Sequence, residues 1–287
     1  MDRFWLVYVA AVLAVSLIAS DPGRDATARA AHFGVHFAAL WIALGIARLA
    51  RRDHGAARWW RAGFAVVGLP IVFSAKCWLL PYVHPEPYEY TFAAFDRAVF
   101  GGDVARLADG VLRPWVVEGL QLIYGVFYLV PLVAALGALR RTGPAAFDRA
   151  VAILVGAFLV SYLGYVLVPT VGPKVALAFD RELDGLWLFG HVRGWIDGAE
   201  ANQWDCFPSG HTMLTLVSLL LLWRWHRPLF WWLLAPCVLL VLSTVLLRYH
   251  WTADVLAGAL LVWPTVWSID RLLDRDGWPP AVAAAWN

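Results

Sequence analysis

Charged residues are scarce in this sequence. They make up 15% of its 287 residues, whereas a soluble domain carries roughly 25%. Hydrophobic residues make up 61%, and apolar runs recur along the whole length. This composition excludes a separate soluble domain and indicates an integral membrane protein. The net charge is only +2 and the basic residues form no stripe, so nucleic-acid binding has little support.

Cysteine is also scarce. Cys77, Cys206 and Cys237 are an odd number and show no C-x-x-C or Cys/His ligand spacing, so we expect neither a metal site nor a cofactor. Cys77 and Cys206 both fall near the predicted outer face of the membrane. A disulfide between them therefore stays open, although packed thiols are the favoured interpretation.

A signal-peptide cleavage site is missing from the first apolar run, "FWLVYVAAVLAVSLIAS". Leu17 or Ile18 falls where a small residue is required. We therefore expect this run to stay in the protein as a membrane helix.

Eight apolar runs are long enough to cross a bilayer as helices, and they predict an all-α, polytopic transmembrane bundle. The predicted spans are 4–20, 33–50, 62–80, 114–138, 150–169, 209–224, 228–248 and 253–270. Two connections are long. Residues 81–113 have the apolar spacing of an amphipathic helix that lies along the membrane surface, and residues 170–208 form an acidic, glycine-containing loop.

Arginine placement predicts the orientation of the bundle. With eight spans, every short arginine-rich connection falls on the same side as both termini, which is then cytoplasmic. These arginines are Arg3, Arg48, Arg51, Arg52, Arg58, Arg61, Arg140, Arg141, Arg149, Arg224, Arg227, Arg271 and Arg275. Residues 81–113, 170–208 and 248–253 then face outward from what we expect to be a bacterial-type plasma membrane.

A polar cluster, "PSGH", opens the span at 209–224 on the predicted outer side. The first turn of a helix has backbone N–H groups without internal partners and carries partial positive charge. Ser209 and Gly210 can therefore present an anion site, with His211 placed to give or take a proton near neutral pH. The alternative is a serine N-cap followed by an interfacial histidine.

A second polar cluster, "RYHWTAD", opens the span at 253–270. His250 and Asp254 are four residues apart and can meet if the segment is helical. A carboxylate on one imidazole nitrogen leaves the other free to attack. We expect Thr252 to cap the helix and Arg248 to supply a cation suited to phosphate. The alternative is an Arg and a His that flank a turn at the interface.

Together these clusters resemble the type 2 phosphatidic acid phosphatase (PAP2) superfamily, whose usual signature is K-x6-RP, PSGH and SR-x5-H-x3-D. The second motif matches fully at Pro208, Ser209, Gly210 and His211. In the third, Thr244 replaces the arginine, and Arg248 follows four residues later, one helical turn along.

The first motif is altered as well. Gly172 stands at its arginine position and Tyr165 at its lysine position, with Lys174 just beyond. The text "PTVGPK", the third motif R-x-H-x3-D and "FDRAVFG" at 95–101 resemble one branch, the inositol-phosphorylceramide synthase-like (Aur1-type) proteins.

The resemblance implies a metal-independent phosphoryl transfer. His250 would be the nucleophile, Asp254 would orient it, and His211 would be the general acid and base. Lys174, Ser209, Gly210 and Arg248 would hold the phosphate. The resemblance also implies a PAP2-like catalytic domain with a six-helix core at 62–271, preceded by two extra spans at 1–61 and followed by a cytoplasmic tail at 272–287.

Three functions stay open. The leading one is a phosphatase or phosphotransferase that acts on a lipid-linked phosphate, or on a phospholipid, at the outer leaflet. A headgroup transferase of the inositol-phosphorylceramide synthase type would share the phosphohistidine. A non-enzymatic anion transporter is less favoured, because the sequence has no internal repeat and its polar residues lie at span ends.

Several polar residues carry structural expectations. Tyr124 and Tyr128 are four residues apart and could line a substrate groove, although packing is the favoured interpretation. We expect Glu118 to face protein or the interface. Asp96 is expected to be structural. Asp205 is either a neighbour that tunes His211 or an ordinary loop carboxylate.

Overall fold

The computed structural model describes residues 2–19, 26–76, 80, 88–107, 109, 112–199 and 204–278. These residues form helices and no β-strand, which confirms the all-α prediction. Cys77 and the tail from 279 lie outside the described residues, as do 81–87 of the first long connection.

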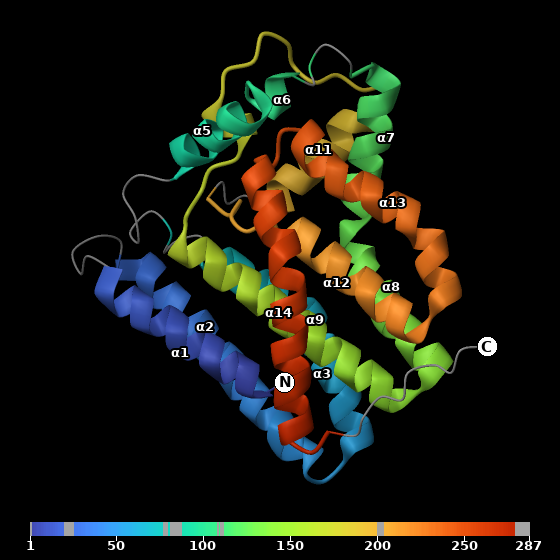
Figure 1. The fold of residues 1–287 in the computed structure, drawn as a ribbon. Helices are drawn as coiled ribbons and strands as arrows, with labels where there is room; N and C mark the ends of the chain where they lie inside the picture. The colour runs from blue at the N-terminus through green and yellow to red at the C-terminus, as the bar shows by residue number, and fades with distance from the viewer. Residues whose placement is uncertain are drawn as a thin grey trace.

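Within the described residues, eight long helical segments coincide with the eight predicted spans to within several residues (Figure 1). They are α1 (Asp2–Ala19), α2 (Ala26–Ala50), α3 (His54–Lys76), α7 to α8 (Pro114–Gly125 and Leu129–Thr142, joined by the 3-10 turn η1, Val126–Tyr128), α9 (Pro144–Leu167), α12 (Gly210–Trp225), α13 (Arg227–Leu246) and α14 (Thr252–Arg275).

Five of the described segments are long and apolar enough to cross a membrane by length and composition. They are Arg29–Ala50, Pro114–Thr142, Pro144–Leu167, Arg227–Leu246 and Thr252–Arg275. The protein is therefore an integral membrane helical bundle.

Helix α12 lies at the centre of the bundle, against α8, α9, α13 and α14. Its sequence is apolar around most of its circumference, and most of its residues are buried, as expected of a helix without a solvent-facing side. Helix α9 is buried in the same way. It also separates α12 from the N-terminal helices, because α1 and α3 pack on α9.

Short helices gather at one end of the bundle (Figure 1). Helix α5 (Glu89–Phe100) and α6 (Val104–Leu107) come from the first long connection, which confirms the predicted helix there. The second connection was predicted as a loop, but it contains α10 (Pro173–Ala176) and α11 (Phe189–Ala199). Four backbone N–H groups, from Leu186 to Phe189, donate to the Glu118 carboxylate at 2.7–3.3 Å. Glu118 faces protein, as predicted, and its acceptors hold the start of α11.

The opposite end of the bundle is closed by ion pairs. Arg149 on α9 contacts Asp270 at 2.8 Å and Asp274 at 2.5 Å on α14. Arg224 at the end of α12 also contacts Asp270, at 2.7 Å. These arginines were counted as orientation signals, and here they also join three helices.

Candidate active site

His211 lies in the first turn of α12. Ser209 is the N-cap, and its hydroxyl accepts a hydrogen bond from the Thr212 N–H at 3.2 Å. The next residue is Gly210, and a Cβ at this position would collide with the Tyr165 hydroxyl. The N-cap interpretation of Ser209 is therefore confirmed, and the first turn of α12 begins inside the protein with His211 exposed to the cavity described below.

His250 is placed by a tight reversal between α13 and α14. Helix α13 ends at Leu246, and Arg248 has a left-handed backbone with φ of 69°. The N–H groups of Tyr249 and His250 both donate to the Thr244 carbonyl, at 3.0 and 2.9 Å. These bonds close the end of α13 and direct His250 toward α12.

Asp254 is fully buried behind His250. Its Oδ2 lies 3.4 Å from His250 Nδ1 and accepts a hydrogen bond from the Trp251 N–H at 2.9 Å. The predicted pairing of His250 with Asp254 is therefore present. The prediction that Thr252 caps α14 is wrong, because Thr252 is the first helical residue and its hydroxyl donates to Asp96 on α5.

The PSGH and H-x3-D motifs also meet through their backbones. The Ser209 N–H donates to the Asp254 carbonyl at 3.0 Å. Gly258 permits this approach, since a Cβ there would lie 2.6 Å from the Ser209 carbonyl oxygen. The starts of α12 and α14 are thus locked together at the site.

The two imidazoles face a common space. The ring centroids of His211 and His250 are 5.8 Å apart. His211 also stacks on Tyr124 at 4.4 Å and contacts Phe127 at 4.1 Å. The Tyr124 hydroxyl lies 3.4 Å from His211 Nδ1. Tyr124 was predicted to be a packing residue, and the sequence carried one further signal for it, its spacing of four residues from Tyr128, which also suits side chains that line a groove.

Lys174 reaches the same space from α10. Its backbone N–H donates to the Arg248 carbonyl at 2.8 Å, and its ammonium pairs with Asp197 of α11 at 2.5 Å. Gly172, at the arginine position of the first motif, has the Tyr249 carbonyl where a Cβ would stand. No larger side chain fits there, so Lys174 is the cation that this segment brings to the site.

Arg248 lies differently from the other predicted site residues. Its Nη2 donates to Asp109 at 2.8 Å and to the Arg181 carbonyl at 2.7 Å, and the guanidinium covers Phe179. The argument that Arg248 sits one helical turn beyond Thr244 is wrong, because α13 ends before it. Arg248 Nε has no hydrogen-bond partner among the described residues.

A cavity of about 440 Å³ connects these groups to the interior of the bundle. His211, His250, Gly210 and Lys174 line one end of it, with Asp197, Asp205 and Tyr124. From there it continues between α3, α8 and α9 along apolar side chains. The polar site is therefore the head of an apolar cavity.

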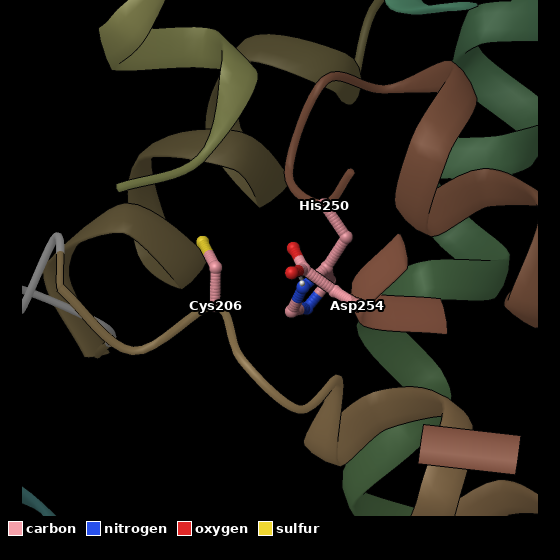
Figure 2. A group of neighbouring side chains, drawn as sticks. All are labelled: Cys206, His250 and Asp254. Atoms are coloured by element: carbon pink, nitrogen blue, oxygen red, sulfur yellow. Dashed lines mark ion pairs between the residues drawn. The ribbon is translucent and has the colours of Figure 1, made fainter. Parts of the chain in front are cut away.

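Figure 2 shows three side chains that converge beside this head: Cys206, His250 and Asp254. One ligand atom of each lies within 4.8 Å of the others, and Asp254 Oδ1 has no hydrogen-bond partner among the described residues. Sulfur, imidazole nitrogen and carboxylate oxygen are all ligand types of Zn²⁺. The sequence spacing gave no hint of this group, because Cys206 comes from a segment distant from the other two residues.

Comparison with known proteins gives one match. A sequence model of the PAP2 superfamily matches residues 90–268. No curated protein and no solved structure matches the chain.

Proposed function

Because this chain belongs to the PAP2 superfamily, we propose that it is a membrane phosphatase or phosphotransferase that acts on a lipid-linked phosphate through a phosphohistidine. The observation that carries the proposal is the 5.8 Å between the imidazole centroids of His211 and His250. A tetrahedral phosphoryl group between the two rings contacts a nucleophile and a proton donor at once.

The first step forms the phosphohistidine. Asp254 faces His250 Nδ1 at 3.4 Å, so Nδ1 carries the proton and Nε2 attacks phosphorus. The bond from phosphorus to the lipid oxygen breaks, and protonated His211 gives its proton to that oxygen. The lipid leaves as an alcohol, and His211 becomes neutral.

The second step releases the phosphoryl group. Neutral His211 takes a proton from an incoming water or hydroxyl, whose oxygen attacks phosphorus as the bond to His250 Nε2 breaks. Water yields free phosphate, and a hydroxyl acceptor yields a new phosphate ester. His211 ends protonated, ready for the next cycle.

The phosphate oxygens need donors in both steps. The start of α12 offers backbone N–H groups at Gly210 and His211 and the partial positive charge of a helix N-terminus. Lys174 adds a cation, which exchanges Asp197 for the phosphate. Arg248 does not line the cavity, so its contact with the phosphate would require the guanidinium to turn from Asp109 and the Arg181 carbonyl toward His250.

The predicted orientation puts this chemistry at the outer leaflet. The site lies at the end of the bundle that carries α5, α6 and α11 (Figure 1). The arginine-rich connections 48–61, 140–149 and 224–227 belong to the other end. A lipid phosphate in the outer leaflet therefore meets His211 and His250 at its headgroup.

We also propose, from the resemblance to the Aur1-type branch, that the acceptor in the second step can be a hydroxyl group. Its P-x-x-G-P motif is present at 169–173, and Gly172 is required by the approach of the Tyr249 backbone. A hydroxyl acceptor would then compete with water in the second step.

A rate assay with purified protein tests the proposal. We expect phosphate release from a lipid phosphate, and we expect His250→Ala or His211→Ala to lower it roughly 10³-fold or more. His54→Ala, at the opposite end of the molecule, is the matched control and should keep the unmodified rate. An unchanged rate in folded His250→Ala protein refutes the proposal. Free phosphate without an acceptor identifies hydrolysis, whereas headgroup exchange without free phosphate identifies transfer.

A further inference from the structure

The cavity below the catalytic head has the length of the membrane. Along α9 its lining begins near the site at Tyr165 and ends at Phe147, close to the first turn of the helix. Eighteen residues of α-helix span roughly 27 Å, and the hydrocarbon core of a bilayer is about 30 Å thick. The apolar cavity therefore passes well beyond the middle of the bilayer.

Three helices each give one face to this cavity. On α9 the lining residues Phe147, Val151, Leu154, Phe158 and Tyr162 recur at helical spacing. On α3 the lining residues Ala62, Val66, Leu69 and Phe73 do the same. Both α3 and α8 pack on α9, so the cavity lies over α9 with α3 and α8 as its walls.

Helix α3 runs beside α9 in the same direction. Trp59 contacts Phe147 with ring centroids 5.6 Å apart, and Phe73 contacts Tyr162 at 5.5 Å. Val66 stands halfway between these two contacts on α3. Its side chain is 62% exposed, so the cavity opens sideways at mid-depth toward the lipid that surrounds the bundle.

We infer that this cavity binds the hydrocarbon chain of the substrate, and that the chain is longer than one leaflet, as in a polyprenyl phosphate. The inference rests on the proposed function, because the phosphate at His211 and His250 fixes one end of the chain. From those residues the cavity passes the hydroxyl-bearing side chains of Ser161, Tyr162 and Tyr165 and meets no further charged side chain among the described lining residues. A fatty acyl chain fills one leaflet, about half of the 30 Å core, and leaves the far half of the cavity empty.

The inference also gives α3 a role in selecting the substrate. Helix α3 lies before residue 90, where the superfamily match begins, and it forms one wall of the cavity. A wall that extends the cavity past mid-depth favours long chains over short ones, because a long chain makes more packing contacts with the cavity lining and leaves less of it unfilled.

A substitution halfway down the cavity tests the inference. Val66→Trp places an indole in the cavity at mid-depth, and Val67→Trp is the matched control. Val67 is adjacent, 59% exposed and absent from the cavity lining, about 100° around the helix. The probes are a polyprenyl phosphate and decyl phosphate, whose chain ends before Val66.

We expect the unmodified protein to prefer polyprenyl phosphate in kcat/KM, and Val66→Trp to lower the polyprenyl-to-decyl ratio about tenfold or more relative to Val67→Trp. Equal ratios in the two variants, or no preference in the unmodified protein, would overturn the inference while phosphate release still supports the proposed function.

A binding measurement separates the two claims when no phosphate is released. Polyprenyl phosphate should raise the melting temperature of Val67→Trp protein more than that of Val66→Trp protein. A larger shift for Val67→Trp without any turnover would contradict the proposed function but support the assignment of the cavity to the hydrocarbon chain. Equal shifts in both variants reject the cavity assignment.

Discussion

At the scale of single residues, His211 is held by contacts that its own motif does not encode. Tyr124 stacks on one face of its ring and places a hydroxyl 3.4 Å from Nδ1, and Phe127 packs nearby. Such a partner fixes the ring orientation of a catalytic histidine. Tyr124 is therefore a positioning residue in the proposed mechanism.

Removing the Tyr124 hydroxyl tests this role. Tyr124→Phe keeps the stacked ring, so we expect KM within about twofold of the unmodified value and kcat reduced roughly 10- to 100-fold. Tyr90→Phe, on an exposed position of α5, is the control. A lowered melting temperature with an unchanged kcat would assign Tyr124 to packing alone.

The group formed by Cys206, His250 and Asp254 makes a second prediction at this scale. The proposed mechanism uses no metal, so a chelator should leave the rate of phosphate release unchanged. Added Zn²⁺ should inhibit, because a tetrahedral Zn²⁺ site places ligand atoms roughly 3.4 Å apart, and His250 Nδ1 and Asp254 Oδ2 already have that spacing. A zinc ion bound there would coordinate Asp254 and so remove its interaction with His250.

Cys206→Ser distinguishes this site from a general effect of zinc. We expect the inhibition constant for Zn²⁺ to rise about tenfold or more in this variant, with Cys237→Ala as the control. Loss of activity in chelator with recovery in Zn²⁺ would mean that the metal takes part in the reaction, against the prediction from the sequence.

At the scale of elements, the long helices were predictable, because hydrophobic runs and the PSGH and H-x3-D clusters are local in the sequence. Their ends were less predictable, since α2 begins at Ala26 and α3 at His54, several residues before the predicted starts at 33 and 62. The arrangement of the short helices beside the site was not predictable from the sequence. Helix α11 begins where Glu118, about seventy residues earlier, accepts its N–H groups. The pair of Lys174 with Asp197 depends on that helix. The course of the cavity along α3 and α9 depends on packing between segments that no local pattern links.

Helix α5 is tied to α14 by a single buried carboxyl. The Thr252 hydroxyl donates to Asp96, and burial raises the pKa of the Asp96 carboxyl above its ordinary value while the Thr252 hydrogen bond opposes this. A raised pKa in the folded state means that the ionised form costs stability at neutral pH. That cost disappears as the pH falls below the ordinary carboxyl pKa.

Asp96→Asn should therefore melt at a higher temperature than the unmodified protein at neutral pH, since the amide oxygen still accepts from Thr252 without a charge. The difference should shrink as the pH is lowered through the raised pKa. Asp96→Ala leaves the Thr252 hydroxyl without this acceptor and should lose about 1–3 kcal/mol of stability. Equal destabilisation by Asn and Ala at neutral pH would contradict this account.

At the scale of the whole molecule, the predicted orientation in the membrane follows from the distribution of the arginine residues. Arg52 lies in the short connection between α2 and α3, and Trp187 lies beside α11 at the site end with 87% of its side chain exposed. Neither membership of the superfamily nor the helical fold determines which side of the membrane the site faces. The predicted outward position of the site therefore depends on the arginine distribution.

Labelling of intact cells tests that position. A membrane-impermeant thiol reagent should label Trp187→Cys before lysis and Arg52→Cys only after lysis, with the unmodified chain as the measure of background. The reverse pattern would place the site on the cytoplasmic side and remove the outer leaflet from the proposal.

Trapping the intermediate tests the central claim, that His211 and His250 share one phosphoryl group. An aryl phosphate has a leaving group that needs no proton, so His211→Ala protein should still be phosphorylated by it, whereas the second step lacks its base. After an alkaline quench, mass mapping should place the phosphate on His250, and the His211→Ala, His250→Ala double variant should carry none. Phosphate on another residue, or release of the aryl group with no phosphorylated protein, would contradict the account.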